Sequence, residues 1–191
     1  MALKKGHEIA TIDVNLVTVV TNETTPKEIA LDTSNQVQVS PQIETTDPIK
    51  LIIKGILKAQ KREQQTITGN TITLTDNVFN PELVQIIQGG TITTDGSGHI
   101  TKYEPPVVGT DPASVPVFTL CFYTAQYDAS GLIVQYEKIT YPNCTGNPVA
   151  FQAQDDVFAT PEYTIISAPA VGESPYTIDY VPSLPSVADA D

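Results

Sequence analysis

One segment of this sequence, Val78 to Gly90, has the start and stop signals of an α-helix, whereas the other regular segments have the composition of β-strands. Asn80 is a suitable N-cap, Pro81 favours the first helical position, and Gly89 permits a left-handed exit. The apolar stripe at helical spacing consists of Leu83, Val84, Ile86 and Ile87. Because about two turns of helix are not stable alone, we expect this stripe to dock on the rest of the protein.

The strand signals are clearest where Phe118–Tyr127 and Leu132–Tyr141 flank the turn sequence DASG. Both segments are rich in β-branched and aromatic residues, which favours a hairpin. Further strands are indicated at residues 148–154, 162–169 and 176–181. The sequence therefore predicts a mainly β fold, a β-sandwich or rolled sheet with one short flanking helix at about residues 80–88.

A basic segment that begins after Asp47-Pro48 fits either a helix or a strand, and periodicity alone does not distinguish them. As a strand, it places one set of residues on one face (Ile49, Leu51, Ile53, Leu57 and Ala59) and another on the opposite face (Lys50, Lys54, Lys58 and Arg62). Gly55 within the segment and the Thr/Ile-rich alternation after it favour the strand. We expect a long hairpin from Ile49 to Thr75.

Charge is distributed unevenly along the chain, whose formal net charge is −12. Residues 1–62 hold 8 Lys/Arg and 7 Asp/Glu, whereas residues 63–191 hold 2 and 15. Half of the positive charges form one cluster: Lys50, Lys54, Lys58, Lys61 and Arg62. This cluster is either a solvated strand face or a docking surface for the acidic part of another copy. The acidic excess repels nucleic acid and argues against ordinary DNA binding.

The length of 191 residues suits one domain. We expect an N-terminal arm or outer strand over residues 1–25, a β domain over 26–182 and a flexible acidic tail over 183–191. The sequence has no apolar run of membrane-spanning length and no signal-peptide core. A protein kept in the cytoplasm would hold Cys121 and Cys144 reduced.

Residues for catalysis are sparse. His7 and His99 are far apart, and neither has the spacing of a metal site. Asp155 and Asp156 are adjacent, which in a strand would point them to opposite faces, so a solvated loop is favoured. Arg62 is the sole arginine, which leaves little for bidentate anion binding. The sequence predicts neither an enzyme nor a cofactor or metal site.

The order of these features resembles the major tail tube proteins of long-tailed, siphovirus-type phages of Gram-positive bacteria. The similarity covers roughly Ile43 to Pro185. It is carried by the succession TITGNTITLTDNVFNPELVQIIQGGTIT, YEPP, FTLCFYTAQYDASGLIVQYEKITYPNCTGNPV, PEYTIISAP and PYTIDYVPSLP. The resemblance implies a structural virion protein that assembles into stacked, usually hexameric rings, with strands that pool into a continuous β-lined channel.

The resemblance also gives roles to particular residues. The helix would cover the sheet face opposite the lumen, and the basic hairpin would reach a neighbouring subunit. DNA would pass as cargo that does not stick to the acidic lumen, for which Glu44 and Glu137 are candidates. The expected partners are other copies and other tail proteins, without a membrane, in a tail assembled in the host cytoplasm. A tail terminator, a capsid decoration protein and a surface adhesin remain alternatives.

Overall fold

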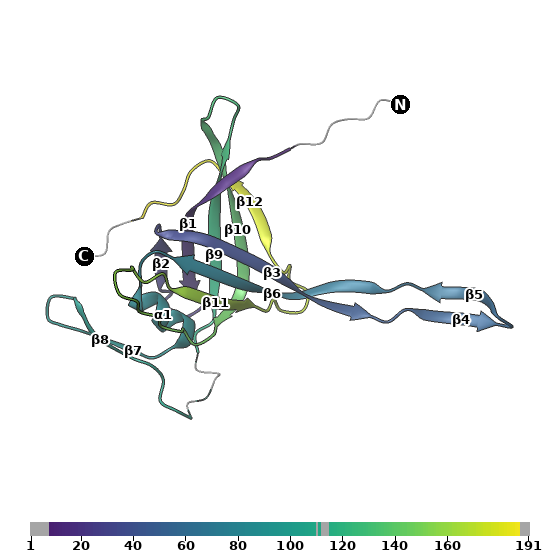
Figure 1. Cartoon of the computed structure of the whole chain (residues 1–191), viewed down its shortest axis with the longest axis horizontal. Coiled ribbons are helices and arrows are strands. Elements are labelled where there is room, and N and C mark those ends of the chain that lie inside the picture. The colour runs from purple at the N-terminus through teal and green to yellow at the C-terminus, as the bar shows by residue number, and fades with distance from the viewer. Residues whose placement is uncertain (1–7, 110, 112–114, 188–191) are drawn as a thin grey trace.

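The computed structural model describes residues 8–109, 111 and 115–187. Eight antiparallel strands form one sheet in the order β2-β1-β9-β10-β11-β6-β3, and β12 also pairs with β10 (Figure 1). Their bounds are β1 Thr11–Thr21, β2 Glu28–Leu31, β3 Ser34–Thr46, β6 Gln64–Asp76, β9 Phe118–Tyr127, β10 Ile133–Gly146, β11 Glu162–Ser167 and β12 Thr177–Val181. The expected mainly β fold with one short helix is confirmed.

Strand β10 joins the two halves of the sheet. Its residues Tyr136–Thr140 pair with β12, whereas Cys144–Gly146 pair with β11. The register with β9 shifts between these two segments, where Asn143 has a φ of 49°. A bulge bends a strand and increases its twist. The sheet accordingly rolls over, and side chains of β6 and β11 share one core with those of β1, β9 and β10.

Strand β1 lies inside the sheet, between β2 and β9. Val17 and Val19 on its inner face are fully buried in the core. The expectation that residues 1–25 form an arm or outer strand is therefore wrong for Thr11–Thr21, and residues 1–7 lie outside the described part. Both sheet neighbours of this strand come from later in the chain, so its own alternation does not reveal that it is central.

The segment after β12 returns to the sheet. Val181 and Leu184 pack on a small cluster on the outer face of the sheet, made of Leu16, Cys121 and Tyr123. The expected flexible tail over 183–191 therefore begins as a packed segment, and its last residues, 188–191, lie outside the described part. Leu184 holds this segment because it brings a large apolar side chain to an otherwise polar stretch.

The long hairpin is larger than expected. β3 and β6 pair from Ser34–Asp76 to Thr46–Gln64, and β4 (Ile49–Ile53) and β5 (Ile56–Lys61) continue it. Figure 1 shows this part extending far beyond the body. Ile49–Ile53 and Ile56–Lys61 are strands, but the expected span of 49–75 is wrong, because the arms start at Ser34 and end at Asp76. The turn lies at Lys54-Gly55, since Gly55 is a turn residue and not a mid-strand residue.

Helix α1 spans Pro81–Gln88 and has the expected ends. The Asn80 side chain accepts hydrogen bonds from the backbone N–H groups of Glu82 and Leu83, at 3.0 and 3.1 Å. Gly89 follows with a positive φ of 79°. The Asn80 cap begins the helix and the positive φ of Gly89 ends it, as the sequence predicts.

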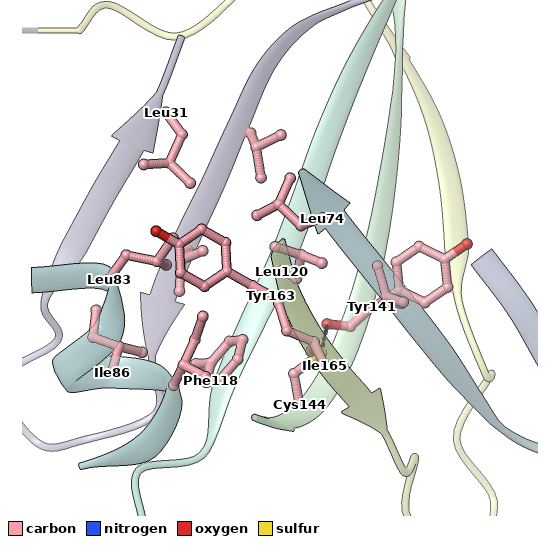
Figure 2. Close-up of a cluster of buried hydrophobic side chains, with 14 of the residues drawn as sticks. Leu31, Leu74, Leu83, Ile86, Phe118, Leu120, Tyr141, Cys144, Tyr163 and Ile165 are labelled. Atoms are coloured by element: carbon pink, nitrogen blue, oxygen red, sulfur yellow. Dashed lines mark hydrogen bonds between the residues drawn. The ribbon is translucent and has the colours of Figure 1, made fainter. Parts of the chain in front are cut away.

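The helix closes one end of the rolled sheet. Its apolar residues are at most 2% exposed and belong to the main core: Leu83, Val84, Ile86 and Ile87. Figure 2 shows Leu83 and Ile86 in the same cluster as Phe118 and Tyr163, which come from β9 and β11. Gly146 at the end of β10 permits this approach, because a Cβ there would overlap the side chain of Ile87.

Two segments outside the sheet complete the chain. β7 (Thr91–Thr94) and β8 (Ile100–Glu104) form a separate two-stranded hairpin. The strand expected at residues 148–154 is wrong: this part of the β10–β11 connection has a single isolated bridge, between Gln154 and Val157. The connection instead forms an irregular loop beside the end of β11.

Candidate assembly surface

The end of the long hairpin, Ile49–Arg62, groups exposed apolar side chains, and we call it the distal hairpin. Its six large aliphatic side chains are 46% to 67% exposed: Ile49, Leu51, Ile52, Ile53, Ile56 and Leu57. A two-stranded hairpin alone is marginally stable in water. Grouped apolar residues on a protruding element are typical of an interaction surface.

The tip of the distal hairpin has a strained residue. Lys54 and Gly55 have φ values of 50° and 76°, as a two-residue turn with two left-handed positions requires. Asn, Asp or Gly is preferred at the first of these positions, and a lysine there costs roughly 1 kcal/mol. The chain thus keeps a positive charge at the tip at the expense of local backbone stability.

The register of the distal hairpin spreads its apolar residues over both faces. Leu51 pairs with Ala59 and Ile52 pairs with Leu57, so Lys58 is the extra residue of a bulge. Directly opposed residues share a face. Leu57 therefore lies with Ile52 and not with Leu51, which corrects the expected division into one apolar and one basic face. The cause is the bulge, which shifts the alternation by one residue.

The basic residues of the distal hairpin are all exposed: Lys50, Lys54, Lys58, Lys61 and Arg62. Among the described residues, none of the five forms an ion pair. The distal hairpin itself contains no carboxylate, so the rest of the chain holds the other 5 Lys/Arg and all 22 Asp/Glu. The structure therefore concentrates positive charge on a protrusion from a strongly acidic body.

The two acidic candidates lie in different environments. Glu44 is exposed on β3, opposite Thr66 on the stem of the long hairpin. Glu137 is half-buried on β10, where Thr124 Oγ1 donates a hydrogen bond of 3.4 Å to its Oε2. It shares the inner face of β10 with Ile139 and Tyr141, because these positions alternate with period two. The structure does not bring the two carboxylates together.

A second apolar surface lies in the β10–β11 loop, and we call it the aromatic pocket. It has a volume of about 760 Å³, and its lining includes Phe79, Phe151, Val157, Phe158, Glu162 and Thr164. Phe79 and Phe151 contact each other with ring centroids 5.5 Å apart, and Phe158 is 94% exposed. The sequence interpretation missed this pocket because it treated the stretch AQDDVF as a solvated loop. The available signal was two phenylalanines in a loop that has no strand alternation.

The remaining reactive side chains do not form a site. Among the described residues, no group of three or more His, Cys, Asp and Glu side chains could hold a metal ion. His99 is an exposed turn residue, 3.3 Å from Asp95 Oδ2 through its Nδ1 atom, and His7 lies outside the described part. Backbone hydrogen bonds, first from Ser97, lower the pKa of the Asp95 carboxyl. This contact lies at the surface, within a turn.

Both cysteines are free and buried. The Cys144 Sγ atom lies 3.3 Å from the carbonyl oxygen of Tyr141, and burial raises the pKa of its thiol to about 12. Since thiolates are the reactive form, such a thiol is unreactive at neutral pH. Cys144 is a core side chain.

Of the helices in the described ranges, none combines the length and the apolar character needed to cross a membrane.

No protein-family model matches the chain, and no curated protein matches it. Two solved structures align with most of the chain. A chain of the extended sheath-tube complex of the extracellular contractile injection system PVC is 16% identical, with a TM-score of 0.43 and coverage of 89% of this chain and 92% of the other. A chain of the anti-feeding prophage baseplate is 9% identical, with a TM-score of 0.38 and coverage of 94% and 97%. Both TM-scores lie below 0.5, so neither likeness assigns a role to this chain.

Proposed function

We propose that this protein is a self-assembling structural subunit of a phage tail tube. In this proposal, copies form stacked hexameric rings whose β-sheets line a channel for DNA. Other tail proteins attach to the tube, which is assembled in the cytoplasm of a Gram-positive host and becomes part of a long-tailed virion. The subunit has no catalytic task and needs no cofactor.

The distal hairpin is the observation that carries this proposal. Six exposed aliphatic residues on a protruding hairpin are unfavourable in water, because burying apolar surface stabilises by about 25 cal/mol per Å². The protein as a single copy leaves that free energy unused. A second copy that covers the hairpin would gain it, and would also pair an exposed strand edge.

The charge distribution supports self-association over binding to an unrelated acidic partner. A body with net negative charge repels other copies of itself, and this repulsion falls when a basic element lies in the contact. The same acidic body suits a channel through which DNA slides, because phosphates are not held by carboxylates. Glu44, which is exposed on β3, is the lumen-facing carboxylate that we propose, whereas Glu137 lies on the core-facing side of β10 and is not proposed for the lumen.

The test is negative-stain electron microscopy of the purified protein over a series of concentrations and salt. We expect hollow filaments of uniform width. The triple variant Lys54→Glu, Lys58→Glu and Lys61→Glu should stay folded and form no filaments, because it reverses the charge of the distal hairpin. Its matched control reverses three body lysines, Lys27, Lys102 and Lys138, and so has the same net charge.

The outcomes separate the alternatives. Filaments from the hairpin variant, with the control unchanged, would remove the hairpin from assembly. Equal loss in both variants would show that net charge alone controls association. Discrete closed rings that never stack would favour a tail terminator or a capsid decoration protein. A protein that stays monomeric throughout the series would contradict self-assembly from purified subunits.

A further inference from the structure

The distal hairpin needs a receiving surface, and we infer that this surface is the aromatic pocket of a second copy. The inference rests on the proposed self-assembly and adds to it the identity of the two contacting surfaces. The contact would place the turn Ile53–Ile56 and its flanking aliphatic residues against Phe79, Phe151 and Phe158.

The two surfaces lie at opposite ends of one strand, which excludes contact within a single copy. The pocket residue Glu162 is paired with Thr75 at the end of β6, whereas the distal hairpin continues from the start of β6 at Gln64. From Ile56 to Thr75 the extended chain spans roughly 60 Å at about 3.3 Å per residue. Figure 1 accordingly shows the hairpin leaving the body on the side away from α1 and the start of β11.

The surfaces are complementary in apolar character. The tip offers Ile53 and Ile56, which are 46% and 59% exposed, and the pocket offers Phe151 and Phe158, which are 67% and 94% exposed. Exposed aromatic side chains beside a concavity are the kind of anchor that dominates binding between proteins. A pocket of about 760 Å³ has the size that takes a drug-sized ligand, and a two-residue turn with its flanking isoleucines has comparable bulk.

The surfaces are also complementary in charge. The β10–β11 loop and the start of β11 carry Asp155, Asp156 and Glu162, and the sequence has no Lys, Arg or His from residue 139 to its end. The distal hairpin carries five positive charges and no carboxylate. Docking therefore brings unpaired lysines to unpaired carboxylates, which favours this orientation over others and speeds association.

The arrangement determines what kind of assembly results. A tip on one copy and a pocket on the next form a heterologous contact, since the same patch does not meet itself. Such contacts repeat in one direction, and they close into a ring or continue as a filament. The tip–pocket contact is thus sufficient to build an open or closed polymer from one kind of chain.

Photo-crosslinking of the full chain tests the contact. A photoactivatable benzophenone amino acid replaces Ile53, and an isotopically labelled copy is mixed in so that crosslinks between copies are recognised by mass. We expect the crosslinks to map to residues 147–164 and Phe79 of a second copy. The matched control carries the same group at Leu132, which is 66% exposed at the turn of the β9–β10 hairpin, and should give no crosslink in the pocket.

A complementation experiment supplies a second readout. Phe158→Ser should raise the concentration needed for assembly about tenfold or more, as loss of an aromatic anchor does. The equally exposed Val171→Ser should leave it unchanged. Mixing Phe158→Ser with the triple hairpin variant should yield a 1:1 dimer, because one copy supplies an intact tip and the other supplies an intact pocket.

The failures are distinguishable. Filaments whose crosslinks map outside the pocket, or mixed variants that remain monomeric, overturn the pocket as the receiving surface and leave the tube proposal intact. Absence of both filaments and crosslinks between copies at every concentration overturns both. Crosslinks confined to one copy overturn the tip–pocket contact.

Discussion

Helix α1 and the distal hairpin are both short apolar segments, but the first is buried and the second is exposed. The helix buries its apolar side chains almost completely: Ile86 is 2% exposed and Ile87 is 0% exposed. The distal hairpin carries the same residue types, yet Ile49 and Ile52 are 67% and 59% exposed. Neither segment is stable in isolation, since two turns of helix and a lone hairpin are both marginal in water.

The two segments differ in whether the rest of the same chain buries their apolar side chains. Gly146 leaves room for Ile87 on the rolled sheet, so the helix is completed within one chain. The hairpin projects beyond the strands of the sheet (Figure 1), and its register places its apolar residues on both faces. We therefore expect substitutions in the helix to act on folding and substitutions in the hairpin to act on assembly.

The largest effect expected is that of a charge in the helix contact. Ile86→Asp places an unpaired carboxylate in the core and should lower the free energy of unfolding by about 4 kcal/mol, or prevent folding. Ile52→Asp makes the same chemical change on the hairpin and should alter that free energy by less than about 0.5 kcal/mol while abolishing assembly. Urea denaturation and sedimentation velocity measure the two quantities.

Two outcomes of this matched pair would contradict the contrast between the helix and the distal hairpin. Unchanged melting of Ile86→Asp would show that the helix is not part of the core. Strong destabilisation of the Ile52→Asp monomer would show that the hairpin is already packed within one chain.

The next largest effect separates a buried carboxylate from an exposed one. Asp76 is fully buried at the end of β6, and its Oδ1 accepts hydrogen bonds from Thr33 Oγ1 at 2.6 Å and from the N–H groups of Asn77 and Val78 at 2.7 and 3.4 Å. Asp76→Ala should cost about 2 to 3 kcal/mol, because hydrogen bonds to a charged group are lost. Asp155→Ala, in the exposed loop, should leave stability unchanged and weaken assembly. Equal urea midpoints for both variants would contradict this assignment.

A third effect appears at alkaline pH and concerns the core alone. Burial raises the pKa of the Cys144 thiol from its ordinary value of 9.0 to about 12. Below pH 9 the folded and unfolded chains both keep this proton, and as pH rises toward 12 the unfolded chain loses it first, so stability falls. At about pH 10.5 the thiol accounts for roughly 2 kcal/mol of this loss.

Cys144→Ala removes that loss, so its curve of unfolding free energy against pH should be flatter than that of the wild type between pH 9 and 12. Parallel curves would show that the thiol does not control the alkaline decline. The buried Tyr141 hydroxyl, whose pKa burial also raises to about 12, continues to titrate in both proteins.

Capping residues, turn residues and local composition correctly predicted the elements that depend on short-range interactions. The ends of α1 follow from Asn80, Pro81 and Gly89, and the β9–β10 hairpin follows from its composition and its turn. The position of β1 in the sheet was not predictable in this way, because its pairing with β2 and β9 depends on the packing of the whole rolled sheet and not on local sequence. Its residues are consistent with either a central or an outer strand.

The sequence indicates one part of the candidate assembly surface, the basic cluster, but not the aromatic pocket. The basic cluster is visible in the sequence because its five charges fall within 13 consecutive residues, but the turn at Gly55 and the bulge at Lys58 decide which side chains share a face. The aromatic pocket depends on Phe79 meeting Phe151, a contact between residues far apart in the sequence. No periodic pattern records such a contact.

The smallest effect on stability, and the most specific test of the comparison, is expected for Lys54→Asn. Asparagine is preferred at the left-handed turn position that Lys54 occupies at a φ of 50°, so the substitution should relieve strain and stabilise the hairpin by up to about 1 kcal/mol. It also removes one positive charge from the tip and should raise the concentration needed for filaments several-fold. Sedimentation against concentration measures that shift, with Lys54→Arg as the variant that keeps both charge and strain. Stronger assembly by the asparagine variant would mean that hairpin rigidity, and not its charge, limits docking.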